Sequence, residues 1–271
     1  MELPVSLMRK PIITLLTDFG TKDHYVASMK GVILGINPGC TLIDITHEVH
    51  PQDIMEGTVL LANTFSYFPK GTIHLAVVDP GVGGKRRPVL LETKNYFFVG
   101  PDNGLFTLVA KRDRVKQVIG LTNKKYFLPD ISSTFHGRDI FAPVAAHLSL
   151  GMRPGAFGEK LDHWRKLKFR EPKVKRQKLS GEIIFIDRFG NLISNIEQAR
   201  FRSFIKGQPF VIRVGDEVIS DIKRGYWEGG KQETIALFGS GGHLEISVHK
   251  GNAQKVLKVK RGDAIRISIE S

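Results

Sequence analysis

The chain has 271 residues and a mass of 30.3 kDa, with 41% hydrophobic and 25% charged residues. This composition is enough to bury the core of one large or two modest domains, and it excludes an intrinsically disordered chain. The 40 basic and 27 acidic residues leave a formal charge of +13, which favours anionic partners or a basic surface but does not determine the fold. A single cysteine, Cys40, excludes a disulfide framework and a four-cysteine zinc site.

Neither a targeting signal nor a membrane-spanning segment is expected. Met1–Lys10 is short, and Pro4 and Arg9 interrupt its apolar residues, which does not fit a secretory signal. No apolar run approaches the roughly 18–20 residues that a transmembrane helix needs. We therefore expect a cytoplasmic protein that has no membrane partner.

Up to about residue 150 the chain alternates between strand-like and helix-like patterns. The predicted strands are Ile12–Thr17, Thr41–Thr46, Thr72–Val78, Val89–Thr93 and Tyr96–Val99. The predicted helices are His24–Ile36, Pro51–Tyr67, about Gly104–Ala110 and about Asp139–Leu150. Short β–α–β units of this kind predict an α/β domain, with a mostly parallel sheet covered by helices on both faces.

A densely basic run, Lys160–Lys178, follows this region. It contains Pro172 and few core-forming residues, which is typical of a solvated linker. A groove for a phosphate backbone is the alternative interpretation, and it predicts salt-dependent retention of RNA. The run has no aromatic residues beyond Trp164 and Phe169 and matches no nucleic-acid-binding motif, so we expect no nucleic-acid partner.

After Leu179 the pattern changes to successive strands with glycine-rich turns. The clearest strands are Gly181–Asp187, Pro209–Val214, Thr234–Phe238, Leu244–Val248 and Ala264–Ile269. Helical periodicity is weak apart from a short stretch near Ala253. A small antiparallel barrel or sandwich fits this pattern best. We therefore predict an α/β domain over residues 9–165, a basic linker over 166–178 and an all-β domain over 179–271.

Carboxylates stand at or just after the ends of three predicted strands or their exit loops: Asp18, Asp79 and Asp102. Ligands of parallel α/β sheets bind beyond the carboxyl ends of the strands, so these residues indicate a binding rim. Aspartate also favours turns and helix caps, which is the alternative explanation for each of them taken singly.

Two loops of the first domain combine chemically active residues with glycine. The sequence Asp79-Pro80-Gly81-Val82-Gly83 follows a buried strand, and its glycines allow the backbone to approach a ligand closely. Either Arg86 or Arg87 could fold back onto Asp79, although a surface ion pair is the simpler possibility. His136 lies in a glycine-bounded loop before a helix, where it could equally be a solvated or capping residue.

One loop of the second domain, Asp187-Arg188-Phe189-Gly190-Asn191, has the residues needed to hold a purine. Phe189 can stack on the ring and Asn191 can form hydrogen bonds with its edge, whereas a tight turn is the alternative. Asp18-Phe19-Gly20 lacks the other kinase motifs, and Gly81–Lys85 is too short for a phosphate-binding loop. No HExxH pair or tight His/Asp cluster is present, so we expect no catalytic metal.

Several segments together carry a family resemblance that runs from about Ile12 to Ile269. They are LLTDFGTKDHYVASMKGVILGINP, VVDPGVGGKRRP, FVGPDNGLF, STFHGRDIFAPVAAHL, IDRFGNLISNI and FGSGGHLEISVHKGNA. In this order they resemble the S-adenosyl-L-methionine hydrolases. These enzymes are also called S-adenosyl-L-methionine hydroxide adenosyltransferases, and they are relatives of the fluorinases and chlorinases.

The resemblance implies a Rossmann-like first domain, a β-barrel second domain and a homotrimer. Each site would lie between the first domain of one subunit and the second domain of its neighbour. The family cleaves the C5′–sulfonium bond of S-adenosylmethionine with water, giving adenosine and L-methionine without a cofactor. Its hydrolytic branch is marked by an Asp–Arg–His set, which matches Asp79, Arg86 and His136 here, and the spacing favours Arg86 over Arg87.

The chemistry of that set suits hydrolysis. A sulfonium is already a good leaving group, whereas free water holds its protons tightly and is a poor nucleophile. We hypothesise that Asp79 and His136 orient and polarise a water molecule in line with C5′, while Arg86 holds Asp79.

The resemblance also implies a substrate-binding set, which divides between the two domains. Asp18 would bind the ribose hydroxyls, Asp23 would lie near the methionine end, and Asp187 would meet the methionine ammonium. Phe189 and Asn191 would hold adenine, and the loop from Ser240 to Val248, including Glu245, would close around the nucleoside.

Other positions bear on whether the enzyme is a hydrolase or a halogenase. Gly241 replaces an arginine and Tyr25 replaces a serine of the halogenases, so both changes fall at the methionine end. The halogenases carry an insertion where Leu91–Phe97 passes straight through here, which favours hydrolysis. The alternatives are a halogenase that uses chloride and a non-catalytic nucleoside-binding protein.

Overall fold

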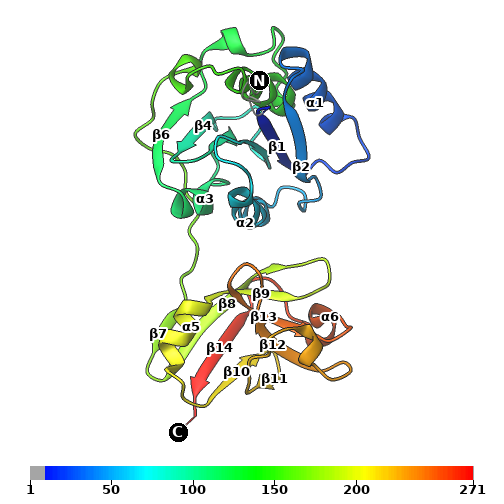
Figure 1. The fold of residues 1–271 in the computed structure, drawn as a ribbon, viewed down its shortest axis with the longest axis vertical. Coiled ribbons are helices and arrows are strands. Elements are labelled where there is room, and N and C mark those ends of the chain that lie inside the picture. The colour runs from blue at the N-terminus through cyan, green and yellow to red at the C-terminus, as the bar shows by residue number, and fades with distance from the viewer. Residues whose placement is uncertain (1–9, 271) are drawn as a thin grey trace, which may run out of the picture. The chain divides into compact units, whose positions relative to one another are not determined.

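Two compact units make up the chain, and the division falls between Leu167 and Lys168 (Figure 1). The structure, a computed structural model, describes residues 10–270. Residues 1–9, on which the expected lack of a secretory signal mainly depends, lie outside the described residues, as does residue 271. Within residues 10–270, no helix is both long enough and apolar enough to cross a membrane.

Within the described chain, the first unit is built on a six-stranded sheet in the order β2-β1-β3-β5-β4-β6. Its strands are β1 (Ile12–Thr17), β2 (Thr41–Thr46), β3 (Ile73–Val77), β4 (Pro88–Thr93), β5 (Phe97–Pro101) and β6 (Val115–Gly120). The neighbours from β2 to β5 are parallel, whereas β4 is antiparallel to both β5 and β6. The strand β6 was not among the predicted elements.

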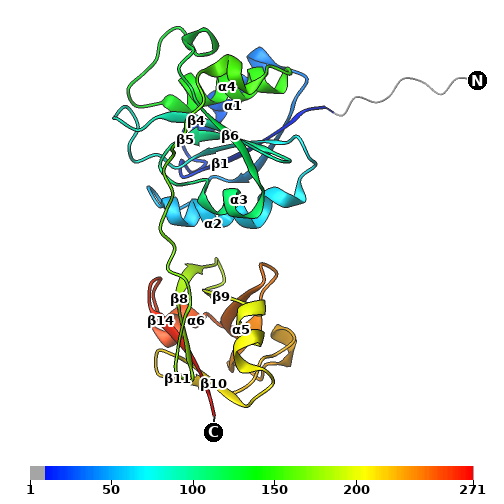
Figure 2. The ribbon, with the colours of Figure 1, turned by 90° about the vertical axis from the view of Figure 1, so that its left-hand side faces the viewer.

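Helices cover both faces of this sheet (Figure 2). They are α1 (Tyr25–Ile36), α2 (Ile54–Thr64), α3 (Thr107–Arg112) and α4 (Ala142–Ser149). Side chains alternate between the faces of a strand. Accordingly, Ile13 and Leu15 of β1 join the core beneath α1 and α4, whereas Leu16 joins the core beneath α2 and α3.

Local signals determine where two of the predicted helices begin. The carboxylate of Asp53 accepts a hydrogen bond from Glu56 N at 3.0 Å, so α2 begins at Ile54 rather than at Pro51. The helix expected from Asp139 begins with a π-helical turn, Gly137–Phe141, which continues into α4. Such turns are frequent at functional sites, and this one directly follows His136.

The second unit is antiparallel, with strands in the order β11-β10-β14-β8-β9-β13-β12 and with β7 paired to β8. Its strands are β7 (Lys173–Lys175), β8 (Lys178–Ile186), β9 (Leu192–Glu197), β10 (Phe210–Val214), β11 (Glu217–Ile219), β12 (Thr234–Phe238), β13 (His243–Val248) and β14 (Ala264–Ile269). Residues 178–182 of β8 pair with β14 and residues 183–186 pair with β9, and the part paired with β9 contains a bulge between Ile183 and Phe185. The sheet therefore curls into a nearly closed barrel (Figure 1).

The predicted fold class, a mostly parallel α/β domain followed by an all-β barrel domain, is confirmed. The second unit also contains α5 (Gln198–Ile205) and α6 (Ala253–Leu257), and only α6 was indicated by the sequence pattern. Phe201, Phe204 and Ile205 of α5 have helical spacing and pack against the core of this unit, but the helix has only eight residues, which is too short for its periodicity to stand out in the sequence. The segment 166–178, predicted as a linker, includes β7 and the first residue of β8.

Candidate active site

Asp79 and Arg86 form a buried ion pair in the loop that leaves β3. Arg86 Nε lies 3.0 Å from Asp79 Oδ1 and 2.8 Å from Oδ2, and Arg86 Nη2 lies 2.5 Å from Oδ2. The side chain of Arg86 is only 7% exposed and that of Asp79 only 4%. A Cβ on Gly81 would come within 3.2 Å of Arg86 Cγ, so the glycine leaves room for the arginine to fold back over its own loop. The interaction is therefore a desolvated, forked pair and not a surface contact.

His136 completes this cluster from a loop that is distant in sequence. Arg86 Nη2 lies 2.7 Å from His136 Nδ1. The two loops meet at Gly83, which has a φ of 73° and whose added Cβ would lie 2.1 Å from Ser133 O. Only glycine can take this conformation at this distance from another backbone. The fold thus brings together the three side chains that sequence analysis grouped as Asp79, Arg86 and His136.

The protonation state of His136 follows from its contact with Arg86. A guanidinium is always protonated and has no acceptor, so Nδ1 must accept the hydrogen bond. The imidazole is then neutral and carries its proton on Nε2. Burial, followed by the positive charge of Arg86, lowers the pKa of His136, although Asp79 and Asp139 oppose the shift. His136 therefore presents an N–H donor on its free side at neutral pH.

Arg87 belongs to a different pair. Its Nε and Nη2 lie 3.0 and 2.6 Å from Asp102 Oδ2, and Nη2 also donates to His163 O at 2.7 Å. Asp102 Oδ1 accepts from Arg165 N at 2.7 Å. Asp102 thus anchors the end of the first unit, and Arg86 is the arginine that contacts Asp79.

Asp18 lies close enough to Asp79 for their charges to interact. Burial raises the pKa of Asp18, and the charge of Asp79 adds to the rise, although backbone hydrogen bonds, including one from Gln52, oppose it. Asp18 Oδ2 accepts from Gln52 N at 2.7 Å, and Gln52 has a φ of 68°. The Asp18 carboxylate is therefore fixed by Gln52 and lies within range of the charge of Asp79.

An aromatic cluster adjoins His136, and of its members sequence analysis gave only Tyr25 a place, at the methionine end. The rings of Phe19, Tyr25 and Phe135 lie 5.0–6.0 Å apart as centroids, in tilted or edge-on pairs. Phe19 follows Asp18 and Phe135 precedes His136, so the cluster links the two loops. The sequence signal that could have found the cluster is that Phe19 stands next to Asp18 and Phe135 next to His136.

Asp23, the residue expected near the methionine end, lies exposed in the turn before α1.

In the second unit, Asp187 organises its own loop. Its Oδ1 accepts from the backbone N of Phe189 and of Asn191, both at 2.9 Å, and its Oδ2 accepts from Asn191 Nδ2 at 2.9 Å. Gly190 has a φ of 85° and leaves no room for a Cβ beside Asn252. Phe189 is consequently held outward and is 74% exposed, whereas Asn191 is buried.

Glu245 of β13 forms a second polar cluster in this unit. Its Oε1 accepts from Tyr226 Oη at 2.6 Å and from Ser247 Oγ at 2.9 Å. Burial and the Glu245 carboxylate raise the pKa of Tyr226, and the charge of Asp187 adds to the rise. Glu245, Tyr226 and Asp187 therefore share one electrostatic environment, and Tyr226 was missed by sequence analysis.

The remaining predicted residues lie on either side of Glu245. Val248 is buried at the end of β13, and Ser240 is exposed in the turn between β12 and β13. Within residues 10–270, no group of three or more His, Cys, Asp or Glu side chains is placed to hold a metal ion.

Both units match one protein family. Residues 13–158 match the family model described as the SAM hydroxide adenosyltransferase N-terminal domain, and residues 181–266 match its C-terminal domain. The (R)-S-adenosyl-L-methionine hydrolase of Methanocaldococcus jannaschii is 41% identical over 267 residues, which cover 94% of this chain and 95% of that protein. The hydrolase of the same name from Thermus thermophilus is 36% identical over 262 residues, which cover 94% of this chain and 98% of that protein.

More distant relatives include a fluorinase from Actinoplanes sp., which is 31% identical over 215 residues. These residues cover 69% of this chain and 72% of the fluorinase. Among solved structures, the crystal structure of an uncharacterized conserved protein from Thermotoga maritima has a TM-score of 0.87 at 40% identity. The match covers 94% of this chain and 99% of the Thermotoga maritima chain.

Proposed function

Because this chain belongs to the SAM hydroxide adenosyltransferase family, we propose that it hydrolyses S-adenosyl-L-methionine to adenosine and L-methionine. The relatives named (R)-S-adenosyl-L-methionine hydrolase support this assignment. The observation that carries it is the buried Asp79–Arg86–His136 cluster, which can bind and polarise a water molecule.

The reaction is a displacement at C5′ of the ribose. The oxygen of water bonds to C5′, the C5′–sulfonium bond breaks, and its electron pair remains on the sulfur of methionine. One proton of the water passes to the carboxylate of Asp79. The neutral thioether needs no acid to help it depart, so the protein's contribution lies in placing and activating the nucleophile.

The geometry divides the roles within the cluster. Asp79 is the acceptor for a proton of the water, since its carboxylate has lone pairs beyond those that Arg86 occupies. Arg86 fixes the carboxylate and the imidazole at once. His136, with Nδ1 engaged by Arg86, offers its Nε2–H as a donor that orients the water oxygen. A positioned group of this kind typically contributes about 10²–10⁴-fold in rate.

Substrate contacts follow from the family motifs. Asp18 binds the ribose hydroxyls, and Asp23 faces the methionine end. The second unit supplies the remaining contacts through Asp187, Phe189, Asn191, Ser240, Glu245 and Val248. The reaction uses no cofactor or metal.

The protein works as a homotrimer, in which the first unit of one subunit and the second unit of a neighbour contribute to the same site. Light scattering measures this state directly, and a monomer at enzymatically active concentrations would contradict it.

Chloride halogenation is the alternative reaction at the same carbon. In this chain β4 and β5 are joined by the short turn at residues 94–96, where the halogenases have an insertion. A halide site also favours apolar walls, whereas the cluster here consists of two charged groups and an imidazole. These features favour water over halide as the nucleophile.

The decisive experiment is turnover of S-adenosylmethionine in ¹⁸O-labelled water, with and without chloride. We expect the label in the 5′-hydroxyl of adenosine and none in methionine. Formation of 5′-chloro-5′-deoxyadenosine in the chloride arm would support the halogenase instead. Binding without any product would support a non-catalytic nucleoside-binding protein.

A further inference from the structure

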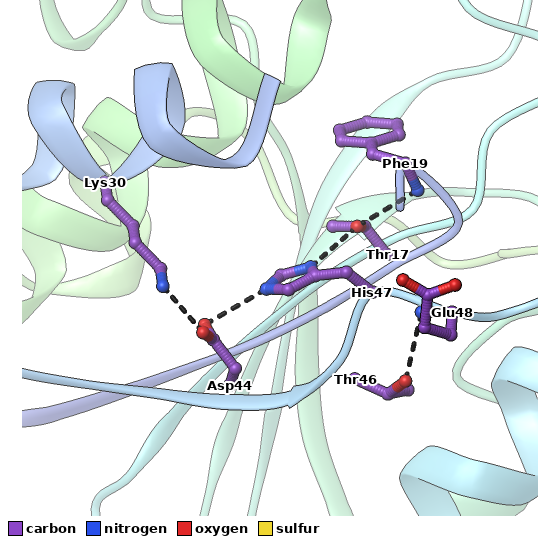
Figure 3. A network of polar contacts seen from close by, with 7 residues as sticks. All are labelled: Thr17, Phe19, Lys30, Asp44, Thr46, His47 and Glu48. Atoms are coloured by element: carbon purple, nitrogen blue, oxygen red, sulfur yellow. Dashed lines mark hydrogen bonds and ion pairs between the residues drawn. The ribbon is translucent and has the colours of Figure 1, made fainter. Parts of the chain in front are cut away.

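His47, which the proposed mechanism does not use, is buried at the end of β2 in a chain of polar contacts (Figure 3). Its Nε2 lies 3.0 Å from Asp44 Oδ1, and its Nδ1 lies 2.8 Å from Thr17 Oγ1. Asp44 also accepts a hydrogen bond from Lys30 Nζ at 2.6 Å. The chain of contacts thus runs from the surface of α1 to the last residue of β1.

On its inner side, this chain of contacts holds the backbone of the loop that follows β1. Thr17 Oγ1 accepts from Phe19 N at 3.2 Å, and the backbone oxygen of His47 accepts from Gly20 N at 2.7 Å. His47 therefore holds this loop through both its side chain and its main chain. The two attachment points, Phe19 and Gly20, directly follow Asp18.

The contacts of this chain differ in kind. Although burial opposes its charge, Lys30 and His47 together lower the pKa of Asp44, so this residue is a carboxylate. Its contact with His47 Nε2 is a close polar approach at 3.0 Å and not an aligned hydrogen bond. On the other side of the ring, Nδ1 shares a hydrogen bond with the hydroxyl of Thr17, and that oxygen also accepts from Phe19 N–H, so Thr17 links the imidazole directly to the backbone of the loop.

A third attachment acts on the Asp18 side chain itself. Its carboxylate accepts from Gln52 N, and Gln52 belongs to the segment that continues from His47. The same segment after β2 therefore holds both the backbone around Asp18 and its carboxylate. A carboxylate that receives two neighbouring ribose hydroxyls needs a closely defined position, because small displacements are costly in a preorganised site.

We propose that His47 is a positioning residue: through Thr17 and Gly20 it holds the loop of residues 17–20 in the conformation that presents Asp18 to the ribose of the substrate. The role of Asp18 rests on the proposed function. His47 does not contact the substrate in this scheme, and it acts on nucleoside affinity more than on the chemical step. His47 thus affects ground-state binding from outside the site.

The test compares two breaks in the chain of contacts with a neighbouring control. His47→Phe removes both polar ends and keeps an aromatic ring, and Thr17→Val removes the middle link at nearly constant volume. Thr46→Val is the matched control, because Thr46 Oγ1 accepts from Glu48 N at 3.0 Å in the same turn but outside the chain of contacts (Figure 3). The measurements are kcat and KM for S-adenosylmethionine, and the dissociation constants of adenosine and L-methionine by calorimetry.

We expect His47→Phe and Thr17→Val each to raise KM and the adenosine dissociation constant about tenfold or more, with kcat changed less than about threefold. Methionine affinity and all constants of Thr46→Val should stay within about twofold of the wild type. The double variant should be little worse than either single one, because both break the same chain of contacts. His47→Asn, whose side-chain oxygen can accept from Thr17, should recover part of the adenosine affinity.

The outcomes separate this inference from the proposed function. Wild-type protein that binds adenosine but makes no product would contradict the function, while the adenosine constants of the variants would still test the positioning role. Folded His47→Phe or Thr17→Val protein with adenosine affinity and KM within twofold of the wild type would overturn the inference. If His47→Phe fails to fold, Thr17→Val and His47→Asn decide the question by the same constants.

Discussion

Two arginine–aspartate pairs stand next to each other in the first unit and do different things. Arg86 and Asp79 are both almost fully buried, and Arg86 reaches a histidine from another loop. Arg87 is 46% exposed, and its partner Asp102 accepts from the backbone of the segment that ends the unit. The two neighbouring arginines thus differ in role because their partners lie in different parts of the fold. The first pair belongs to the candidate active site, whereas the second binds the backbone of residues 163–165.

The largest effect is expected at the acid of the first pair. Asp79→Asn keeps the shape of the side chain but removes the charge that Arg86 balances and the acceptor for the water proton. We expect kcat to fall by about 10²–10⁴-fold with a much smaller change in KM. Steady-state formation of adenosine measures both constants. A variant with near-normal kcat would remove Asp79 from the mechanism.

The two arginines themselves give the sharpest contrast. Arg86→Lys replaces a fork that reaches both Asp79 and His136 by a single ammonium, so we expect kcat to drop about 10²-fold. Arg87→Lys is the matched control, made one residue away with the same chemistry, and its kcat should remain within about threefold of the wild type. Equal losses in the two variants would show that the pairs are not functionally distinct.

The second pair should matter for stability. Arg87→Ala leaves the Asp102 carboxylate buried with its backbone partner alone, and because Arg87 is half-exposed, we expect a loss of about 1–2 kcal/mol in the free energy of unfolding. Urea denaturation measures this loss. Arg153→Ala is a suitable control, since Arg153 is exposed and has no ion pair among residues 10–270. Unchanged stability in Arg87→Ala would refute the anchoring role.

The smallest effect concerns pH. Burial and the charge of Arg86 lower the pKa of His136, so the neutral ring that accepts from Arg86 persists below the ordinary histidine range. We expect kcat/KM to change less than about threefold from pH 8 to pH 6.5 and to fall only at lower pH, as Nδ1 gains a proton and repels Arg86. An acid limb with its midpoint at or above pH 6.5, lost in His136→Asn, would contradict this assignment.

Much of the fold could be predicted because it depends on local patterns. The buried runs of β1 and β3 and the stop at Asn37-Pro38-Gly39 specify their elements within a few residues. The misses have a common cause. β6 and α5 are short, and each contacts a partner that is distant in the sequence: β6 pairs with β4, and Phe201 of α5 packs on Phe238. Tertiary contacts decide such elements more than local propensity does.

By itself, the sequence determined the two-part architecture, the loops that carry polar residues and the grouping of Asp79, Arg86 and His136 through family motifs. The tertiary structure alone decided which partners Arg87 takes, which nitrogen of His136 carries the proton and how the His47 side chain is connected to the Asp18 loop. The physical reason is the distance along the chain over which each kind of interaction acts. Strand and turn preferences act over a few residues, whereas a hydrogen bond's partner and direction depend on atoms that only the folded chain brings within 3 Å.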